Sequence, residues 1–148
     1  MMMSIPKIFL DTSVIVSAVL SSRGGAAEIF RMGESNTVKL YVGSQVLRES
    51  QSGVQRKFPR ALKTLLILLD SGNVEIVPPP TEAQLTFAFE LVSYPPDARV
   101  FAEALMAQPD WFVTHDKAHL LTLKDDTRLT FRIGTPGDFL QAYVGRLN

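Results

Sequence analysis

Four acidic residues have the type and spacing that metal-dependent chemistry requires: Asp11, Glu49, Asp97 and Asp116. Asp11 directly follows an apolar run that ends at Leu10, and Asp116 comes three residues after the apolar run 111–113. If both runs are parallel strands, their carboxyl ends meet at one edge of a sheet, where ligands of such folds bind. The sequence therefore predicts that these two carboxylates lie near one another.

The other two acids belong to segments with a helical pattern. Glu49 follows Val46 by three residues in the segment SQVLRES, so it borders the apolar face of that helix. Asp97 begins the helical segment that precedes the strand candidate 111–113. Each acid also has a purely structural interpretation, because Asp11, Asp97 and Asp116 could cap helices and Glu49 could be a solvated charge.

Carboxylates that converge on one edge repel one another and raise one another's pKa values unless a cation intervenes. Mg²⁺ and Mn²⁺ prefer oxygen ligands, and Mg²⁺ usually keeps several bound waters. Such a water can attack a phosphodiester, and a pair of metal ions can stabilise both the attacking and the leaving oxygen. The acidic set therefore favours phosphodiester hydrolysis with Mg²⁺ or Mn²⁺ as the cofactor.

The elements that must position these acids alternate along the chain. Short apolar runs predict strands at 7–10, 38–42, 74–77, 111–113 and 130–133. Helical patterns cover 12–20, 26–33, 44–58, 59–69, 81–93, 97–107 and 136–147. We expect Ser44, Thr81 and Asp97 to be N-caps, with Gln84 completing a capping box at Thr81. The alternation predicts an α/β fold: a single three-layer α/β/α domain with a mostly parallel sheet of about five strands.

Length and composition limit the class of protein to which the sequence can belong. The 148 residues suit one domain, spanning 1–148, and 46% hydrophobic with 20% charged residues is typical of a globular protein. The absence of cysteine excludes disulfides and thiolate metal sites. No apolar run reaches the roughly 18 residues of a membrane span, and the N-terminal MMMS has no signal-peptide pattern. We expect a cytoplasmic protein without a membrane partner.

The net charge is zero, but basic residues gather in the first half of the sequence. They form a cluster consisting of Arg48, Arg56, Lys57, Arg60 and Lys63. Taken alone, such a cluster is most simply a solvated helix face. If Glu49 borders a cleft at the edge of the sheet, however, Arg48, Arg56, Lys57 and Arg60 could follow a phosphate backbone.

Three further residues have side chains that could take part in chemistry. His115 and His119 are four residues apart and would share a face of a helix, as in some zinc sites, but the metalloprotease Glu is missing between them. We expect an exposed or capping pair, with contact to a phosphate as an alternative. Glu103 lies off the Asp97 face of its helix, so we expect a salt bridge or a solvent-exposed side chain there.

The ordered segments LDTSV, SQVLRES, PPDARVFAEAL and WFVTHDKAHLL together resemble the PIN-domain family, including its VapC-like toxin group. The resemblance runs from Lys7 to about Leu140. It implies a metal-dependent endoribonuclease whose acidic quartet is Asp11, Glu49, Asp97 and Asp116, with Asp11, Asp97 and Asp116 as metal ligands. It also implies that Ser13 and Thr114 support the site. His115 departs from the pattern, because family members often have Gly before the last Asp.

The same resemblance implies RNA as the substrate, and an antitoxin protein and a second copy of the chain as partners. One alternative is a non-catalytic PIN-like module that binds RNA or protein. Another is a phosphotransfer enzyme that uses a strand-terminal Asp. Haloacid-dehalogenase-like phosphatases need a second Asp two residues after the first, where this sequence has Ser13.

Overall fold

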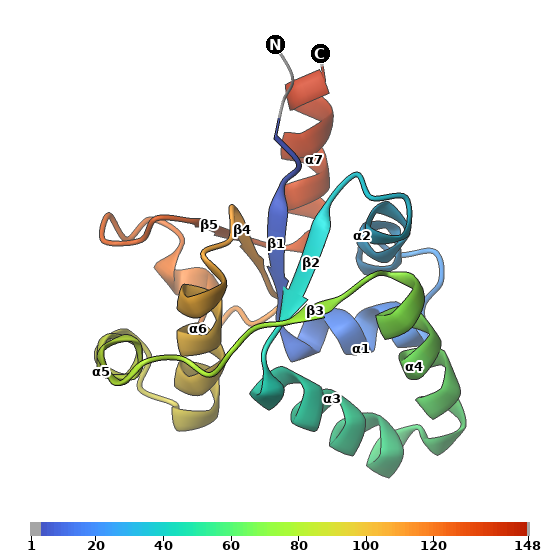
Figure 1. Ribbon diagram of the computed structural model, residues 1–148, viewed down its shortest axis with the longest axis horizontal. Coiled ribbons are helices and arrows are strands. Elements are labelled where there is room, and N and C mark those ends of the chain that lie inside the picture. Colours follow the sequence, from blue (N-terminus) through green and yellow to red (C-terminus); the bar gives the residue numbers. More distant parts are fainter. Residues whose placement is uncertain (1–3, 148) are drawn as a thin grey trace.

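The computed structural model describes residues 4–147, and its centre is a five-stranded parallel sheet in the order β3-β2-β1-β4-β5 (Figure 1). The strands are β1 (Lys7–Leu10), β2 (Lys39–Val42), β3 (Glu75–Ile76), β4 (Trp111–Val113) and β5 (Arg132–Gly134). Every neighbouring pair is parallel, and the predicted α/β/α fold with five strands is confirmed. The short edge strands begin or end within two residues of their predicted positions.

Seven α-helices and two 3₁₀ turns connect the strands. They are α1 (Thr12–Leu20), α2 (Gly25–Glu34), α3 (Ser44–Lys57), η1 (Pro59–Ala61), α4 (Leu62–Ser71), α5 (Glu82–Leu91), α6 (Pro95–Ala107), η2 (Leu121–Leu123) and α7 (Pro136–Leu147). Figure 1 shows α5 and α6 on one side of the sheet and α1 to α4 on the other. This division follows from right-handed crossovers, because the chain steps outward from β1 to β3 and then returns across the sheet to β4.

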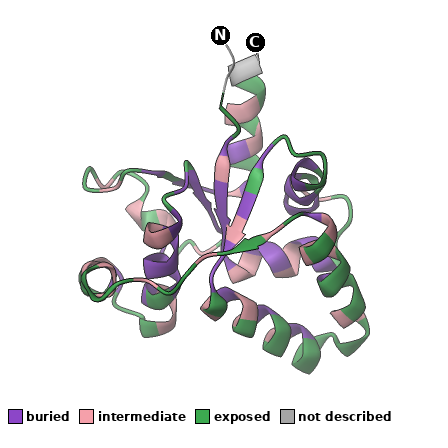
Figure 2. Cartoon of the chain, in the orientation of Figure 1, coloured by how far each residue is buried: buried purple, intermediate pink, exposed green. Residues whose placement is uncertain are grey.

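The two central strands explain why the sheet needs helices on both faces. Ile8, Phe9 and Leu10 of β1 are completely buried, and β4 is buried throughout (Figure 2). Phe101 of α6 stacks on Phe112 of β4, with ring centroids 6.1 Å apart. A continuous apolar strand of this kind is stable only when both of its faces are covered.

Two of the three predicted N-caps are wrong. The N-cap of α3 is Gly43 and not Ser44, and α6 begins two residues before Asp97, with Tyr94 as its N-cap. Pro95 and Pro96 open α6, and because proline has no backbone N–H, these positions need no side-chain cap. The capping box of Thr81 and Gln84 is confirmed.

The sheet order places the carboxyl ends of β1 and β4 side by side, and we call the space beside Asp11, Asp97 and Asp116 at these ends the crevice. The chain leaves β1 into α1 and leaves β4 into a long loop, so the two connections diverge at neighbouring strands. The amide of Asp11 donates to the carbonyl of Val113 at 3.1 Å, which holds the two strand ends together. Ligands of open α/β sheets bind at such a reversal of strand order.

Within residues 4–147, no single helix is long and apolar enough to cross a membrane. Only α1 and α2 taken together meet the length and composition criteria, and they are bent by 94° at the break between them.

Candidate active site

Asp11 lies at the base of the crevice, where its side chain is buried. Its Oδ2 accepts a hydrogen bond from Thr114 Oγ1 at 2.7 Å and another from Ser13 Oγ at 2.9 Å. Burial raises the pKa of Asp11 above its usual range, although these two hydroxyl donors act in the opposite direction. Asp11 occupies the N-cap position of α1 but makes no capping hydrogen bond, and its carboxylate bonds to Ser13 and Thr114 instead.

The two hydroxyl groups also position the loop after β4. Thr114 Oγ1 accepts from the Asp116 amide at 3.0 Å, and Ser13 Oγ accepts from the His115 amide at 3.0 Å. Each hydroxyl therefore donates to Asp11 and accepts from the loop, which fixes the direction of its proton. Ser13 and Thr114 thus link the Asp11 carboxylate to the loop that carries Asp116.

Asp116 is held by the turn that follows it. Its Oδ1 accepts the backbone amides of Ala118 at 3.0 Å and His119 at 2.9 Å. These donors lower the pKa of Asp116 despite its partial burial, and a contact with Asp97 adds to the effect. Residues 117–120 form turns rather than a helix, so His115 and His119 do not share a helix face.

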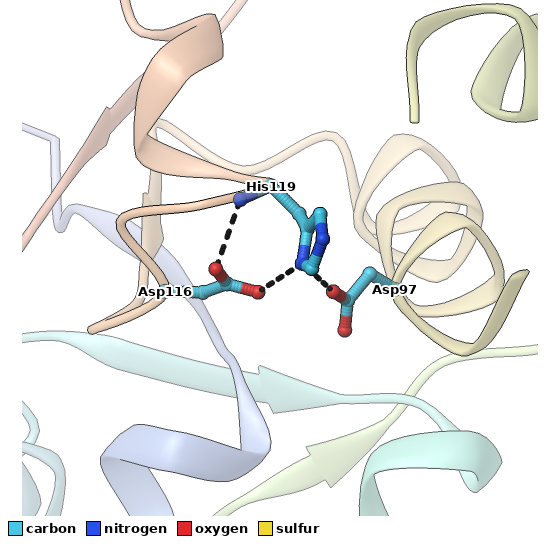
Figure 3. Close-up of side chains that lie close together, drawn as sticks. All are labelled: Asp97, Asp116 and His119. Atoms are coloured by element: carbon cyan, nitrogen blue, oxygen red, sulfur yellow. Dashed lines mark hydrogen bonds and ion pairs between the residues drawn. The ribbon is translucent and has the colours of Figure 1, made fainter. Parts of the chain in front are cut away.

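Asp97 lies in the first turn of α6 and faces Asp116 across the crevice (Figure 3). The pKa of Asp97 is raised to about 7, chiefly by burial and then by the neighbouring carboxylates of Asp116 and Asp11. Two carboxylates with oxygen atoms within 4.8 Å of one another repel each other unless they share a proton or a cation. This donor set of partly buried carboxylate oxygens fits Mg²⁺ or Mn²⁺.

Glu49 lies near Asp11 and is held by different partners. Its Oε1 accepts from Thr12 Oγ1 at 2.7 Å, and its Oε2 accepts from Gln45 Nε2 at 3.2 Å. Its charge raises the pKa of Asp11. The neighbouring hydroxyls of Thr12 and Ser13 therefore serve different acids, since Thr12 donates to Glu49 and Ser13 donates to Asp11.

The basic residues divide into two groups. Arg48 is next to Glu49 and donates to Gln45 Oε1 at 2.9 Å. Arg56, Lys57 and Arg60 are exposed near the end of α3 and in η1, and Arg56 is seven residues beyond Glu49. At 1.5 Å per residue, that separation is about 10 Å along the helix. A shallow, open depression of about 530 Å³ lies on the surface of α3 and is lined by Arg48, Glu49, Gln51, Ser52 and Gln55.

The expectation for Glu103 is wrong, because this side chain is buried and forms no salt bridge with a described residue. Its Oε2 accepts the Gln45 amide at 2.8 Å, at the first turn of α3, and its Oε1 has no hydrogen-bond partner among the described residues. Burial raises the pKa of Glu103. A carboxylate from α6 thus does the capping that sequence reasoning assigned to Ser44.

His119 has a larger role than its sequence pattern indicated. Its Nδ1 lies 2.9 Å from Asp97 Oδ2 and 3.4 Å from Asp116 Oδ2 (Figure 3). Asp97, Asp116 and His119 form a group whose donor atoms all lie within 4.8 Å of one another. The sequence signal for this group is the spacing of three residues between Asp116 and His119, which a tight turn brings to the same side.

Residues 7–118 match the protein family described as PIN domain, which is more than half of the sequence. Among solved structures, the chain is similar to one in the crystal structure of VapBC2 from Rickettsia felis bound to a DNA fragment from their promoter. Sequence identity is 19%, the match covers 86% of this chain and 98% of that chain, and the TM-score is 0.62. No curated protein sequence matches the chain.

The raised pKa of Asp97 predicts how stability depends on pH in the absence of divalent metal. Because this pKa is about 7 and the ordinary value is 3.8, the folded protein binds the proton more tightly than the unfolded chain. The contribution of Asp97 to stability therefore falls as pH rises from about 4 to about 7. We expect Asp97→Asn to be more stable than the wild type by up to about 4 kcal/mol at pH 8, because the pKa of Asp97 rises from 3.8 to about 7, and equally stable at pH 4.

Urea unfolding in EDTA across this pH range measures the difference. Asp70→Asn removes an exposed carboxylate on α4 and should show no such gain. Equal stability of Asp97→Asn and the wild type at pH 8 would contradict the assignment.

The close contact between Gly43 and Glu103 gives a second prediction. A Cβ at residue 43 would overlap the Glu103 carboxyl group, so Gly43→Ala must displace the carboxylate from the end of α3. We expect a loss of about 2–3 kcal/mol in the free energy of unfolding. Gly53→Ala is the matched control on the same helix, where a Cβ meets no atom within 4 Å, and it should stabilise the protein by about 0.5–1 kcal/mol. Similar unfolding free energies for the two variants would show that Glu103 is not held there.

Proposed function

The chain belongs to the PIN-domain family, and on that premise we propose that it is an endoribonuclease that hydrolyses RNA phosphodiesters with Mg²⁺ or Mn²⁺. In this proposal residues 1–148 act as one nuclease domain, and Asp11, Glu49, Asp97 and Asp116 are the catalytic acids. The observation that carries the proposal is the carboxylate pair of Asp97 and Asp116, whose charges call for a cation at the carboxyl edge of the sheet.

Asp11, Asp97 and Asp116 are the residues that would hold the metal. When bound, the ion would supply Lewis-acid stabilisation of the phosphate charge and a water of lowered pKa. Asp11 is oriented by Ser13 and Thr114, and Asp116 by its own turn, so neither carboxylate has to reorganise when a ligand arrives. Fixed groups of this kind stabilise developing charge without a reorganisation cost.

Glu49 and Arg48 extend the site toward the RNA. Thr12 and Gln45 fix the Glu49 carboxylate, which lies near Asp11, and in this proposal Glu49 accepts a proton or orients water. Arg48 brings a positive charge to the same rim. A single RNA strand that follows the exposed face of α3 from this rim would then reach Arg56, Lys57 and Arg60.

We also propose that the protein acts with partner chains. VapBC2 from Rickettsia felis, the structure to which the chain is similar, is a complex bound to promoter DNA. By analogy, this chain would be the toxin of a toxin–antitoxin pair, with an antitoxin protein and a second copy of itself as partners. The support for this analogy is the similarity of the two folds.

The proposed activity predicts metal-dependent RNA cleavage that needs Asp116. We expect purified protein to cleave a labelled single-stranded or stem-loop RNA with Mn²⁺ or Mg²⁺ and to lose activity in EDTA. Asp116→Asn should lower the rate by about 100-fold or more, because it removes a fixed charge at the metal. Gel analysis of the products at matched protein concentrations measures both effects.

Asp70→Asn, purified in the same way, is the matched control and should keep wild-type activity, because its carboxylate is exposed on α4. Cleavage that survives both EDTA and Asp116→Asn would overturn the metal mechanism. RNA binding without cleavage under all conditions would favour the non-catalytic module.

The division of the basic residues predicts a length-dependent role. We expect the triple variant Arg56→Gln, Lys57→Gln, Arg60→Gln to weaken binding of a 12-nucleotide RNA but not of a trinucleotide, because these residues lie about 10 Å from Glu49. Since the triple variant removes three side chains that neutralise phosphates, the slope of log K against log salt should fall by about 2.

Arg48→Gln should weaken binding of both RNAs, because Arg48 lies beside the acids. Fluorescence anisotropy at several salt concentrations measures these slopes, with Ca²⁺ replacing the catalytic metal. An unchanged salt slope in the triple variant would show that Arg56, Lys57 and Arg60 are only a solvated face.

A further inference from the structure

His119 is the one nitrogen donor in the described group of metal-competent side chains. Its Nδ1 points between the two carboxylates and not toward solvent, although 40% of its side chain is exposed (Figure 3). The residue lies one position beyond the segment 7–118 that matches the PIN-domain family. The family match therefore says nothing about it, and its role must come from its own surroundings.

Two contacts fix the orientation of the His119 ring. Its backbone amide donates to Asp116 Oδ1 at 2.9 Å, which sets where the side chain leaves the turn. Tyr94 stacks on the ring with centroids 5.2 Å apart and planes 18° apart. Tyr94 is also the N-cap of α6, the helix that carries Asp97 in its first turn. The same stretch of chain thus positions both the imidazole and its carboxylate neighbour.

The donor spacing suits a shared ion. Ligands about 2.1 Å from one ion and at right angles to each other are about 3 Å apart. The Nδ1 atom lies 2.9 Å and 3.4 Å from the two carboxylate oxygens, which agrees with this spacing. The simpler interpretation is a direct ion pair between imidazolium and carboxylates. The two interpretations differ in whether Nδ1 bonds to the metal once a divalent ion is present.

We propose that His119 Nδ1 is a ligand of the divalent ion held by Asp97 and Asp116. This inference rests on the proposed function and makes it more specific, because it adds a nitrogen donor to the carboxylate oxygens of the site. Imidazole suits transition ions, whereas Mg²⁺ prefers an all-oxygen environment. The site is therefore selective for Mn²⁺ over Mg²⁺, and His119 is the residue that sets this selectivity.

The experiment is pulsed electron paramagnetic resonance of Mn²⁺ bound to the tag-free full chain, together with Mn²⁺ and Mg²⁺ titrations. The matched variants are His119→Gln and His115→Gln, since these are the only two histidines in the sequence and the His115 side chain is exposed. We expect wild type and His115→Gln to show the ¹⁴N hyperfine coupling of a bound imidazole and His119→Gln to lack it. His119→Gln should also lose about tenfold in Mn²⁺ affinity while its Mg²⁺ affinity changes less than about twofold.

The possible results separate this inference from the proposed function. If Mn²⁺ binds to the wild type without imidazole coupling, His119 is not a ligand, while the metal mechanism stands. If the wild type binds no more Mn²⁺ than Asp116→Asn does, both the inference and the metal mechanism fail. The wild-type spectrum decides the ligation by itself, so the test survives even if His119→Gln folds poorly. Equal losses of Mn²⁺ and Mg²⁺ affinity in a folded His119→Gln would overturn the selectivity.

Discussion

The arrangement of the site depends on one buried carboxylate between two neighbouring strands. Asp11 follows β1, and its Oδ2 accepts hydroxyl groups from Ser13 on its own chain segment and Thr114 at the end of β4. An uncompensated charge in this position would be costly to desolvate. The two hydroxyls reduce that cost, and each also accepts a backbone amide from the loop after β4. Solvating Asp11 thereby fixes the loop that carries Asp116.

The surroundings of Asp97 and Asp116 shift the pKa values of these two residues in opposite directions. Two backbone amides solvate Asp116 and lower its pKa, whereas Asp97 is desolvated beside other carboxylates and its pKa rises to about 7. Neighbouring carboxylic acids with different pKa values are typical of catalytic sites. Burial and the neighbouring carboxylates make ionised Asp97 unfavourable in the metal-free protein. A bound cation would offset this repulsion, so the same surroundings favour metal binding.

The sequence was sufficient for the parts of the fold that local patterns determine. Buried strands are continuous apolar runs, as in Ile8–Leu10, and the capping box at Thr81 needs only residues three positions apart. Strand order and contacts between distant residues produce no comparable local sequence pattern, so they could not be predicted in this way. Ser44 was a reasonable cap by its residue type, but the donors at the start of α3 are satisfied by Glu103, which is 58 residues away from Gln45. His119 was likewise assigned as if it lay on a helix, whereas it lies in a turn.

Glu103 shows why those long-range contacts matter to the site. It belongs to α6, whose first turn carries Asp97, and it caps α3, which carries Glu49. A buried carboxylate with one oxygen that lacks a partner among residues 4–147 is a poor source of stability, and an apolar side chain of similar volume would cost less to bury. The Glu103 carboxylate instead holds α6 in a fixed position relative to α3, because it accepts the backbone amide of Gln45 at the start of α3. Because Gly43 leaves room for this contact, a glycine outside the acidic set helps to hold Glu49 and Asp97 at the same edge of the sheet.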